Sequence, residues 1–215
     1  MYITWHGLSC IKLQGDNATV VCNPINKDSG LKAPRFSADI VTLSNESYLT
    51  NVENIKGISA ERPFIISSAG EYEIKDAFIY GIFCQHEKDE NKIDCKNTIY
   101  RIEIDGMTVV HLGDLSHPFS NGQLENLKTV DILILPVGGG QVIDGKQAFI
   151  LANQIEPRLV IPVYYKTPGL KIKVDGLDKF CHEAGVCPTE TVSKYKIAKK
   201  DLPAEDMKIV VLSLV

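Results

Sequence analysis

The 215-residue sequence has no excess of positive charge, no long apolar run and no closely spaced cysteine pair. Its net charge of −4 argues against a protein that neutralises nucleic-acid phosphates, because such proteins present a basic face. No stretch approaches the roughly 20 apolar residues of a membrane span, and residues 1–6 lack the charged and apolar regions of a secretory signal. The sequence therefore predicts a cytoplasmic protein that binds neither nucleic acid nor membranes.

The six cysteines stand at positions 10, 22, 84, 95, 181 and 187, without a CxxC pair. A chain of this length does not need disulfides for stability, so we expect reduced and mostly buried thiols, with zinc binding by cysteine as the alternative. The sequence also lacks a Walker phosphate-binding motif and a GxSxG nucleophile elbow. These absences argue against the two enzyme classes that the motifs define.

Hydrophobic residues make up 44% of the chain and charged residues 23%, which are ordinary values for a globular protein. The length and the absence of internal repeats favour a single domain over residues 1–215. Short β-branched and aromatic runs predict strands, the last at 207–214, and turn residues at 15–17 and 105–106 predict hairpins. Three helical patterns follow, at 121–128, 145–154 and 176–184. This order predicts α and β layers in which helices cover packed sheets.

Several short blocks, in order along the chain, resemble one protein superfamily. The blocks are Ala38-Asp39-Ile40-Val41, Gly70-Glu71-Tyr72-Glu73, 97–106, His111-Leu112-Gly113-Asp114-Leu115, 131–139, 157–162 and Tyr165-Lys166-Thr167. They resemble the metallo-β-lactamase superfamily, and within it the branch of L-ascorbate-6-phosphate lactonase-like and other predicted zinc-dependent hydrolases. The resemblance implies an α/β fold, the αββα sandwich, with a metal site at one edge between the two sheets.

The metal-binding motif of that superfamily is degenerate in this sequence. The resemblance implies four ligands from a histidine-x-histidine-x-aspartate-histidine motif, and at those positions the chain has Asn45, Ser47, Leu49 and Thr50. Neutral amides and hydroxyls are poor zinc ligands. The last ligand histidine falls on Tyr164, whose phenol is mostly protonated at pH 7. Leu8 and Asn23 also stand where the resemblance implies a histidine and an aspartate.

Two ligand-type residues remain, His86 and Asp114, so five of the seven ligand positions are substituted. The two could hold zinc or manganese, with Glu46 or His117 as a third contact. We expect no cofactor, because two protein ligands leave most of the coordination of a zinc ion to water. An aspartate after a glycine can also hold its own loop through backbone N–H groups, and this is the alternative role of Asp114.

Two functions stay open. The first is a non-catalytic or repurposed relative that keeps a vestigial pocket for a small-molecule ligand. The expected pocket residues are Asn45, Glu46, Ser47, Thr50, Tyr164, Gly138 and Gly139, together with His86 and Asp114. The glycines at 138–140 could form an anion-binding nest of backbone amides or a plain turn.

The second function is a divergent metal-dependent hydrolase that acts on a lactone or a phosphoester-type substrate. In this hypothesis His86 and Asp114 bind the metal, and His111 or Tyr164 assists proton transfer. His111 follows apolar residues at a strand end, so a hydrogen-bonded core histidine is its alternative role. The sequence predicts no oligomeric state and offers no surface signature for a protein partner.

Overall fold

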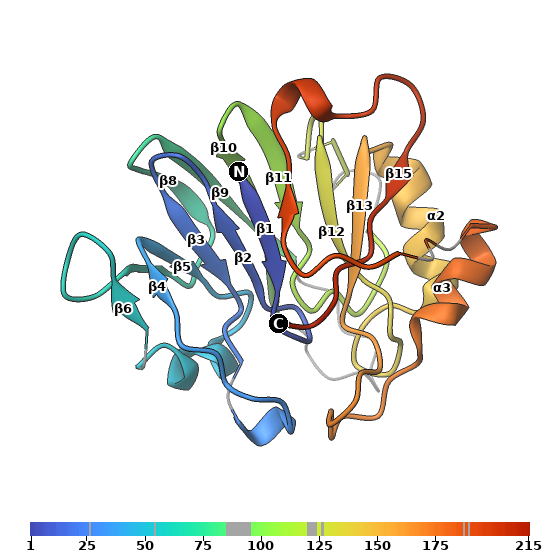
Figure 1. Cartoon of the computed structure of the whole chain (residues 1–215), viewed down its shortest axis with the longest axis horizontal. Helices are drawn as coiled ribbons and strands as arrows, with labels where there is room; N and C mark the ends of the chain where they lie inside the picture. Colours follow the sequence, from blue (N-terminus) through green and yellow to red (C-terminus); the bar gives the residue numbers. More distant parts are fainter. Residues whose placement is uncertain are drawn as a thin grey trace.

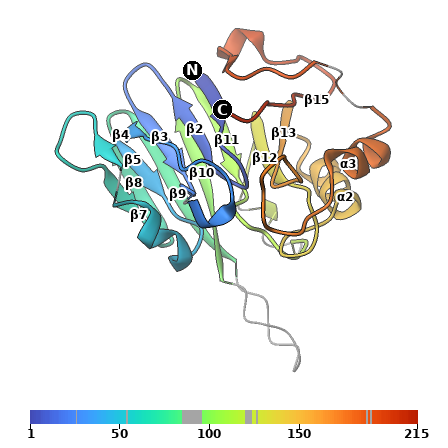
Figure 2. The ribbon, with the colours of Figure 1, turned by 60° about the horizontal axis from the view of Figure 1, so that its bottom comes forward.

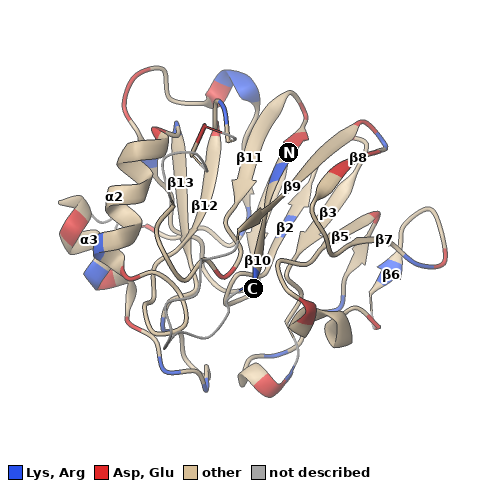
Figure 3. Cartoon of the chain, turned by 180° about the vertical axis from the view of Figure 1, so that it is seen from behind, with Lys and Arg blue, Asp and Glu red and all other residues tan. Residues whose placement is uncertain are grey.

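The computed structural model of the chain describes residues 1–25, 27–53, 55–84, 96–119, 124–125, 127–186, 188 and 190–215. Two β-sheets pack against each other in this part of the chain, and both helices drawn as α-helices lie on the side of the second sheet (Figure 1). Charged residues lie mainly in loops, helices and strand ends, whereas the central strands carry few (Figure 3). The predicted α and β layers are confirmed.

The first sheet has six strands in the order β14-β1-β2-β3-β5-β7. Their bounds are β1 (Tyr2–Trp5), β2 (Ile11–Gln14), β3 (Thr19–Cys22), β5 (Ile40–Thr42), β7 (Phe64–Ile66) and β14 (Tyr195–Lys196). Strands β2 and β3 pair antiparallel, and the Gly15 N–H donates to the Ala18 carbonyl at 2.9 Å in the turn between them. The hairpin predicted from residues 15–17 is therefore confirmed.

The second sheet has seven strands in the order β15-β13-β12-β11-β10-β9-β8. Their bounds are β8 (Gly70–Ile74), β9 (Ala77–Cys84), β10 (Asn97–Ile104), β11 (Met107–His111), β12 (Ile132–Pro136), β13 (Leu159–Val163) and β15 (Lys208–Ile209). Asp105 and Gly106 have φ angles of 51° and 72° and join β10 to β11, as predicted. Every residue of β12 and β13 is buried, as is typical of parallel strands covered on both faces.

Helices α2 (Gly145–Ile155) and α3 (Leu177–Ala184) confirm two of the three predicted helices. Asp144 and Gln147 form a capping box at the start of α2, which satisfies backbone N–H groups that have no partner inside the helix. The third predicted helix, at 121–128, falls partly outside the described residues. No helix in the described part of the chain is both long enough and apolar enough to cross a bilayer.

Five short elements complete the description: β4 (Ser37–Ala38), β6 (Lys56–Gly57), and the 3-10 helices η1 (Lys27–Ser29), η2 (Glu46–Asn51) and η3 (Lys199–Asp201). The predicted last strand, 207–214, is wrong in its length. Only β15 joins the second sheet there, and Leu212 and Leu214 form single bridges with Val192 and Trp5. Buried apolar residues continue beyond β15, but the chain leaves that sheet and reaches the first one.

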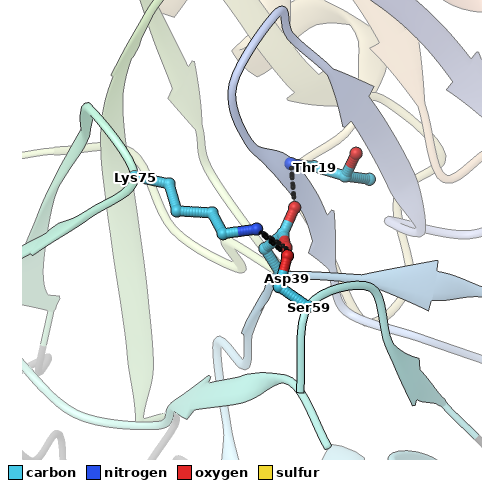
Figure 4. A network of polar contacts seen from close by, with 4 residues as sticks. All are labelled: Thr19, Asp39, Ser59 and Lys75. Atoms are coloured by element: carbon cyan, nitrogen blue, oxygen red, sulfur yellow. Dashed lines mark hydrogen bonds and ion pairs between the residues drawn. The ribbon is translucent and has the colours of Figure 1, made fainter. Parts of the chain in front are cut away.

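A polar cluster ties the two sheets together at one edge (Figure 4). The buried Asp39 carboxylate accepts from the Thr19 N–H at 2.9 Å and pairs with the Lys75 ammonium at 2.6 Å. The Lys75 ammonium also donates to the Ser59 hydroxyl. Since Asp39 lies beside β5 and Lys75 lies in the turn after β8, the cluster bridges the first and second sheets.

The cysteines only partly match the expectation of reduced thiols. Cys10, Cys22 and Cys84 are free and buried. Burial raises the pKa of the Cys84 thiol to about 11, which leaves it protonated and unreactive at neutral pH. Cys181, in α3, is disulfide-bonded, so the expectation is wrong at this residue. Cys95 and Cys187 lie outside the described residues.

Candidate functional site

The ends of several strands bring polar residues to one edge of the sandwich, which Figure 2 turns toward the viewer. Asn23 follows β3, and Asp114 and Tyr164 follow β11 and β13, which lie on either side of β12 in the second sheet. Asn45 follows β5 and is the N-cap of η2, where its side-chain oxygen accepts from the Ser47 N–H at 3.0 Å. The superfamily resemblance implies the metal site at this same edge.

A pocket of about 410 Å³ opens at this edge. It is lined by Asn45, Glu46, Ser47, Lys96, Asn97, Asp114, Gln141 and Tyr164. Five of these are among the residues expected from the sequence. Thr50, Gly138 and Gly139 are not among the lining residues, and His86 lies outside the described residues.

Asp114 is the centre of a compact hydrogen-bond cluster. Its Oδ1 accepts from the Ser9 hydroxyl at 2.6 Å, and its Oδ2 accepts from the Tyr48 hydroxyl at 2.7 Å. The Asn45 side-chain amide donates to the same Oδ2 at 3.2 Å. The Asp114 N–H donates to the Asn97 side-chain oxygen at 3.1 Å, which ties the loop after β11 to the start of β10. Both carboxylate oxygens therefore already have partners within the protein.

The electrostatics of this cluster keep its phenols protonated. Burial raises the pKa of Asp114, while the hydrogen bonds from Ser9, Tyr48 and Asn45 lower it and offset part of that effect. Burial, followed by the nearby Asp114 charge, raises the pKa of Tyr48 well above its ordinary value. The same two causes raise the pKa of Tyr164. Neither tyrosine is therefore a phenolate at neutral pH, and a protonated phenol is a poor metal ligand.

Further hydrogen bonds, made by the buried Asn23, hold the Ser9 side chain in place. The fully buried Asn23 side-chain amide donates to the Ser9 hydroxyl at 3.0 Å and to the Ser44 hydroxyl at 3.1 Å. Its side-chain oxygen accepts from the Ser44 N–H at 2.8 Å. Asn23 thus links β3 to the loop after β5 through neutral hydrogen bonds, at the position where the resemblance implies an aspartate.

Three non-glycine residues around the site adopt left-handed backbone conformations. Leu8 has a φ of 48°, Asn23 of 45° and Tyr164 of 59°. The Tyr164 N–H donates to the Leu8 carbonyl at 3.0 Å, so two of these residues hold each other. Such conformations cost on the order of 1–3 kcal/mol each and persist only where the surroundings enforce them. The remaining non-glycine cases lie mostly in turns and at a helix end, where such angles are common.

His111 is fully buried and both its ring nitrogens contact backbone groups. Nδ1 accepts from the Gly113 N–H at 3.2 Å, so Nε2 carries the proton and donates to the Ser9 carbonyl at 2.8 Å. Burial lowers the pKa of His111 to about 4, which keeps the ring neutral. This geometry favours its alternative role as a core histidine, because it holds the loops that carry Ser9 and Asp114.

Gly113 is needed for the same close packing. Its φ is 63°, and a Cβ at this position would overlap the Ser44 hydroxyl. By contrast, Gly138 and Gly139 are engaged in holding their own loop. The Gly139 N–H donates to the Ile143 carbonyl, and the Gly138 carbonyl accepts from the Asp175 N–H. These contacts favour the plain turn over the anion-binding nest.

The described residues do not fit a metal centre. No three histidine, cysteine, aspartate or glutamate side chains lie close enough together in the described part of the chain to hold an ion. Glu46 is the one other acidic side chain that lines the pocket with Asp114 among the described residues. The remaining lining residues are hydroxyls, amides and a lysine, which are weak or repulsive partners for a divalent cation. His86 cannot be placed in this set, because it lies outside the described residues.

Sequence reasoning missed five residues of the site: Ser9, Tyr48, Lys96, Asn97 and Gln141. One signal was available for Tyr48. In a 3-10 helix residues three apart lie on the same side, so Tyr48 shares a side with Asn45 in η2. The other four reach the site through contacts between distant parts of the chain, which no local pattern indicates.

Comparison with known proteins agrees with the fold. The family model of the β-lactamase superfamily domain matches residues 2–164. A UPF0173 metal-dependent hydrolase of Thermococcus onnurineus is 31% identical over 139 residues, which is 63% of this chain and 59% of that protein. Another, from Methanosphaerula palustris, is 27% identical over 193 residues, 81% of this chain and 88% of its own. The match spans only about 60% of the length of three archaeal relatives, 59%, 61% and 61%.

A solved structure from Thermotoga maritima, a candidate zinc-dependent hydrolase of the metallo-β-lactamase superfamily, covers 99% of both chains. Its TM-score is 0.78 and its sequence identity is 26%. The family model and this structure confirm the superfamily and the sandwich fold that the sequence resemblance implies.

Proposed function

The chain belongs to the β-lactamase superfamily, and we propose that within it this protein keeps the fold and the pocket but not a two-metal hydrolytic centre. In this proposal the pocket binds a small polar molecule without hydrolysing it at a metal. The observation that supports the proposal is the Asp114 cluster, in which Ser9, Tyr48 and Asn45 donate to the carboxylate.

The chemistry of Asp114 follows from these contacts. A carboxylate that binds a metal directs a lone pair at the ion, with a metal–oxygen distance of about 2.0–2.2 Å for zinc. Here Oδ2 already accepts from the Tyr48 hydroxyl and the Asn45 amide. An ion at Oδ2 would have to displace both donors. Because burial and the Asp114 charge raise the pKa of Tyr48, the phenol would not ionise readily to become a ligand itself.

The strained backbone supports a retained use for the pocket. The left-handed conformations of Leu8 and Tyr164 cost free energy, and neither residue is a glycine that would remove the strain. Strain of this kind clusters at functional sites. A scaffold that had lost all function at this edge would gain stability by relaxing it.

The first experiment measures metal content. The purified protein is incubated with excess Zn²⁺ or Mn²⁺, passed through a desalting column and analysed by inductively coupled plasma mass spectrometry. We expect far less than one ion per chain, and the same low content in an Asp114→Ala variant. Two tightly held ions per chain, lost in Asp114→Ala, would overturn the proposal.

A metal-dependent hydrolase that acts on a lactone or phosphoester-type substrate is the second candidate. The names of the relatives and the 26% identical structure favour it. Its test is hydrolysis of a simple lactone and of bis(4-nitrophenyl) phosphate with and without Zn²⁺ or Mn²⁺. Metal-stimulated turnover that disappears in Asp114→Asn supports this candidate, and turnover equal to that of the heat-treated protein rules it out for these substrates.

A further inference from the structure

After their contacts within the protein, the residues that line the pocket have more unused hydrogen-bond donors than unused acceptors. The Lys96 ammonium and the Gln141 side-chain N–H₂ group make no hydrogen bond or ion pair among the described residues, which leaves up to five N–H donors. The Asn45 amide uses one N–H on Asp114 and keeps one more. Donors therefore dominate this part of the pocket.

The acceptors are fewer and mostly used. Both oxygens of Asp114 have donors, and the Asn97 side-chain oxygen accepts from the Asp114 N–H. The Gln141 side-chain oxygen accepts from the Tyr164 hydroxyl at 3.1 Å. Among the lining residues, the Glu46 carboxylate and the hydroxyl oxygens of Ser47 and Tyr164 accept no hydrogen bond from the described part of the chain. A ligand that matches the pocket needs more acceptors than donors.

The pocket lining carries two acidic side chains, Glu46 and Asp114, and one cation, but the Asp114 carboxylate is already satisfied by Ser9, Tyr48 and Asn45. Lys96 is the only cationic side chain that lines the pocket, as far as the described residues show. It forms no ion pair among them, although Glu46 also lines the pocket. Ionised Lys96 attracts an oxyanion, and neutral amides beside it can donate to the same oxygens without adding repulsion.

We propose that the pocket binds a small organic anion whose carboxylate or phosphate group contacts the Lys96 ammonium and the side-chain amides of Gln141 and Asn45. A hydroxyl group elsewhere on the ligand donates to Glu46. The inference rests on the proposed function, because it requires a pocket in which lysine and amides, in place of metal ions, provide the positive charge for the anion.

The test uses three ligands that share one small skeleton: glycerol 3-phosphate, glycerate and glycerol. Binding to the chelator-treated protein is measured by isothermal titration calorimetry in EDTA. We expect one of the two anions to bind and glycerol not to bind, and the preferred anion separates a phosphate site from a carboxylate site. Binding of neither anion, or equal binding of all three compounds, would overturn the inference.

Two variants test the residues. Lys96→Gln keeps the length and polarity of the side chain but removes the charge, so the dissociation constant of the preferred anion should rise roughly ten- to hundredfold. Gln141→Leu removes one neutral donor group and should raise it by a smaller factor, roughly three- to tenfold. Lys56→Gln, an exposed lysine of β6 outside this pocket, is the matched control and should bind like the wild type. Unchanged binding in Lys96→Gln would refute the role of the lysine.

Metal content, measured together with anion binding, distinguishes a failure of the proposed function from a failure of the anion site. The same protein samples are analysed for metal. Anion binding that appears only after Zn²⁺ or Mn²⁺ is restored, together with stoichiometric metal, contradicts the proposed function and this inference with it. Low metal content without anion binding contradicts only the inference. Metal-free binding that depends on Lys96 supports both.

Discussion

Replacing Tyr48 with phenylalanine removes one hydroxyl from the centre of the site and leaves the ring in place. Tyr48 is 7% exposed, and its hydroxyl donates to Oδ2 of Asp114 at 2.7 Å. Hydrogen bonds to charged groups contribute about 1.5–3 kcal/mol, compared with about 0.5–1.5 kcal/mol for neutral pairs. At pH 7 we therefore expect Tyr48→Phe to lower the free energy of unfolding by about 2 kcal/mol.

A control variant separates the contribution of the Asp114 charge from the general cost of losing a buried hydroxyl. Tyr100 is also fully buried, but its hydroxyl donates to the backbone carbonyls of Leu43 and Ile66 at 2.8 and 3.1 Å. Tyr100→Phe is therefore the matched control and should cost about 1 kcal/mol. In an Asp114→Asn background the Tyr48 hydroxyl contacts a neutral amide, so its removal should also cost about 1 kcal/mol.

Urea unfolding followed by far-ultraviolet circular dichroism measures these free energies. A loss of about 2 kcal/mol corresponds to a fall in Tm of about 4–8 °C for a chain of this size. The reasoning is refuted if Tyr48→Phe is within about 0.5 kcal/mol of the wild type, the usual range for uninvolved surface changes. It is also refuted if the cost of Tyr48→Phe is the same with and without the Asp114 charge.

Two further predictions concern the charges. Because burial raises the folded-state pKa of Asp114 above its unfolded value of about 3.9, the protonated carboxyl contributes stability that is lost as the pH rises through the raised pKa. Urea unfolding should therefore show Asp114→Asn gaining stability relative to the wild type between pH 4 and pH 7, and a constant difference would contradict this sign. Lys75→Met leaves the buried Asp39 carboxylate without its cation and should cost about 1–3 kcal/mol. Lys179→Met, which breaks the exposed pair with Asp175, should leave the free energy of unfolding nearly unchanged, and equal costs would contradict the role of burial.

The sequence predicted much of the fold because its strands and turns have local causes. The Asp105-Gly106 hairpin depends on two residues that tolerate positive φ, and the structure has it as predicted. The last strand was predicted too long, because a run of apolar residues indicates that they are buried and does not indicate that they pair with another strand. Val210 and Val211 are buried after β15 ends, where the chain crosses from one sheet to the other.

The sequence predicted only those pocket residues that stand at or between ligand positions of the superfamily resemblance. Asn45 and Tyr164 were expected at the pocket because they occupy ligand positions in the resemblance, and both line it. Ser9 is 105 positions from Asp114 along the chain, and only the folded sandwich brings the two together. Lys96 and Gln141 likewise come from segments whose sequences carry no motif.

The residues at this edge satisfy one another's hydrogen-bonding groups, as the proposed metal-free pocket requires. Loss of metal ligands alone would leave Asp114 buried without donors, and burying an unpaired carboxylate costs far more than a single hydrogen bond returns. Instead, Asn45 both caps η2 and donates to Asp114, and the buried Asn23 donates to Ser9. Each of these neutral residues satisfies a polar group of a neighbouring side chain. Under the proposed function this network satisfies Asp114 within the protein and leaves the lysine and amide donors beside it to a ligand.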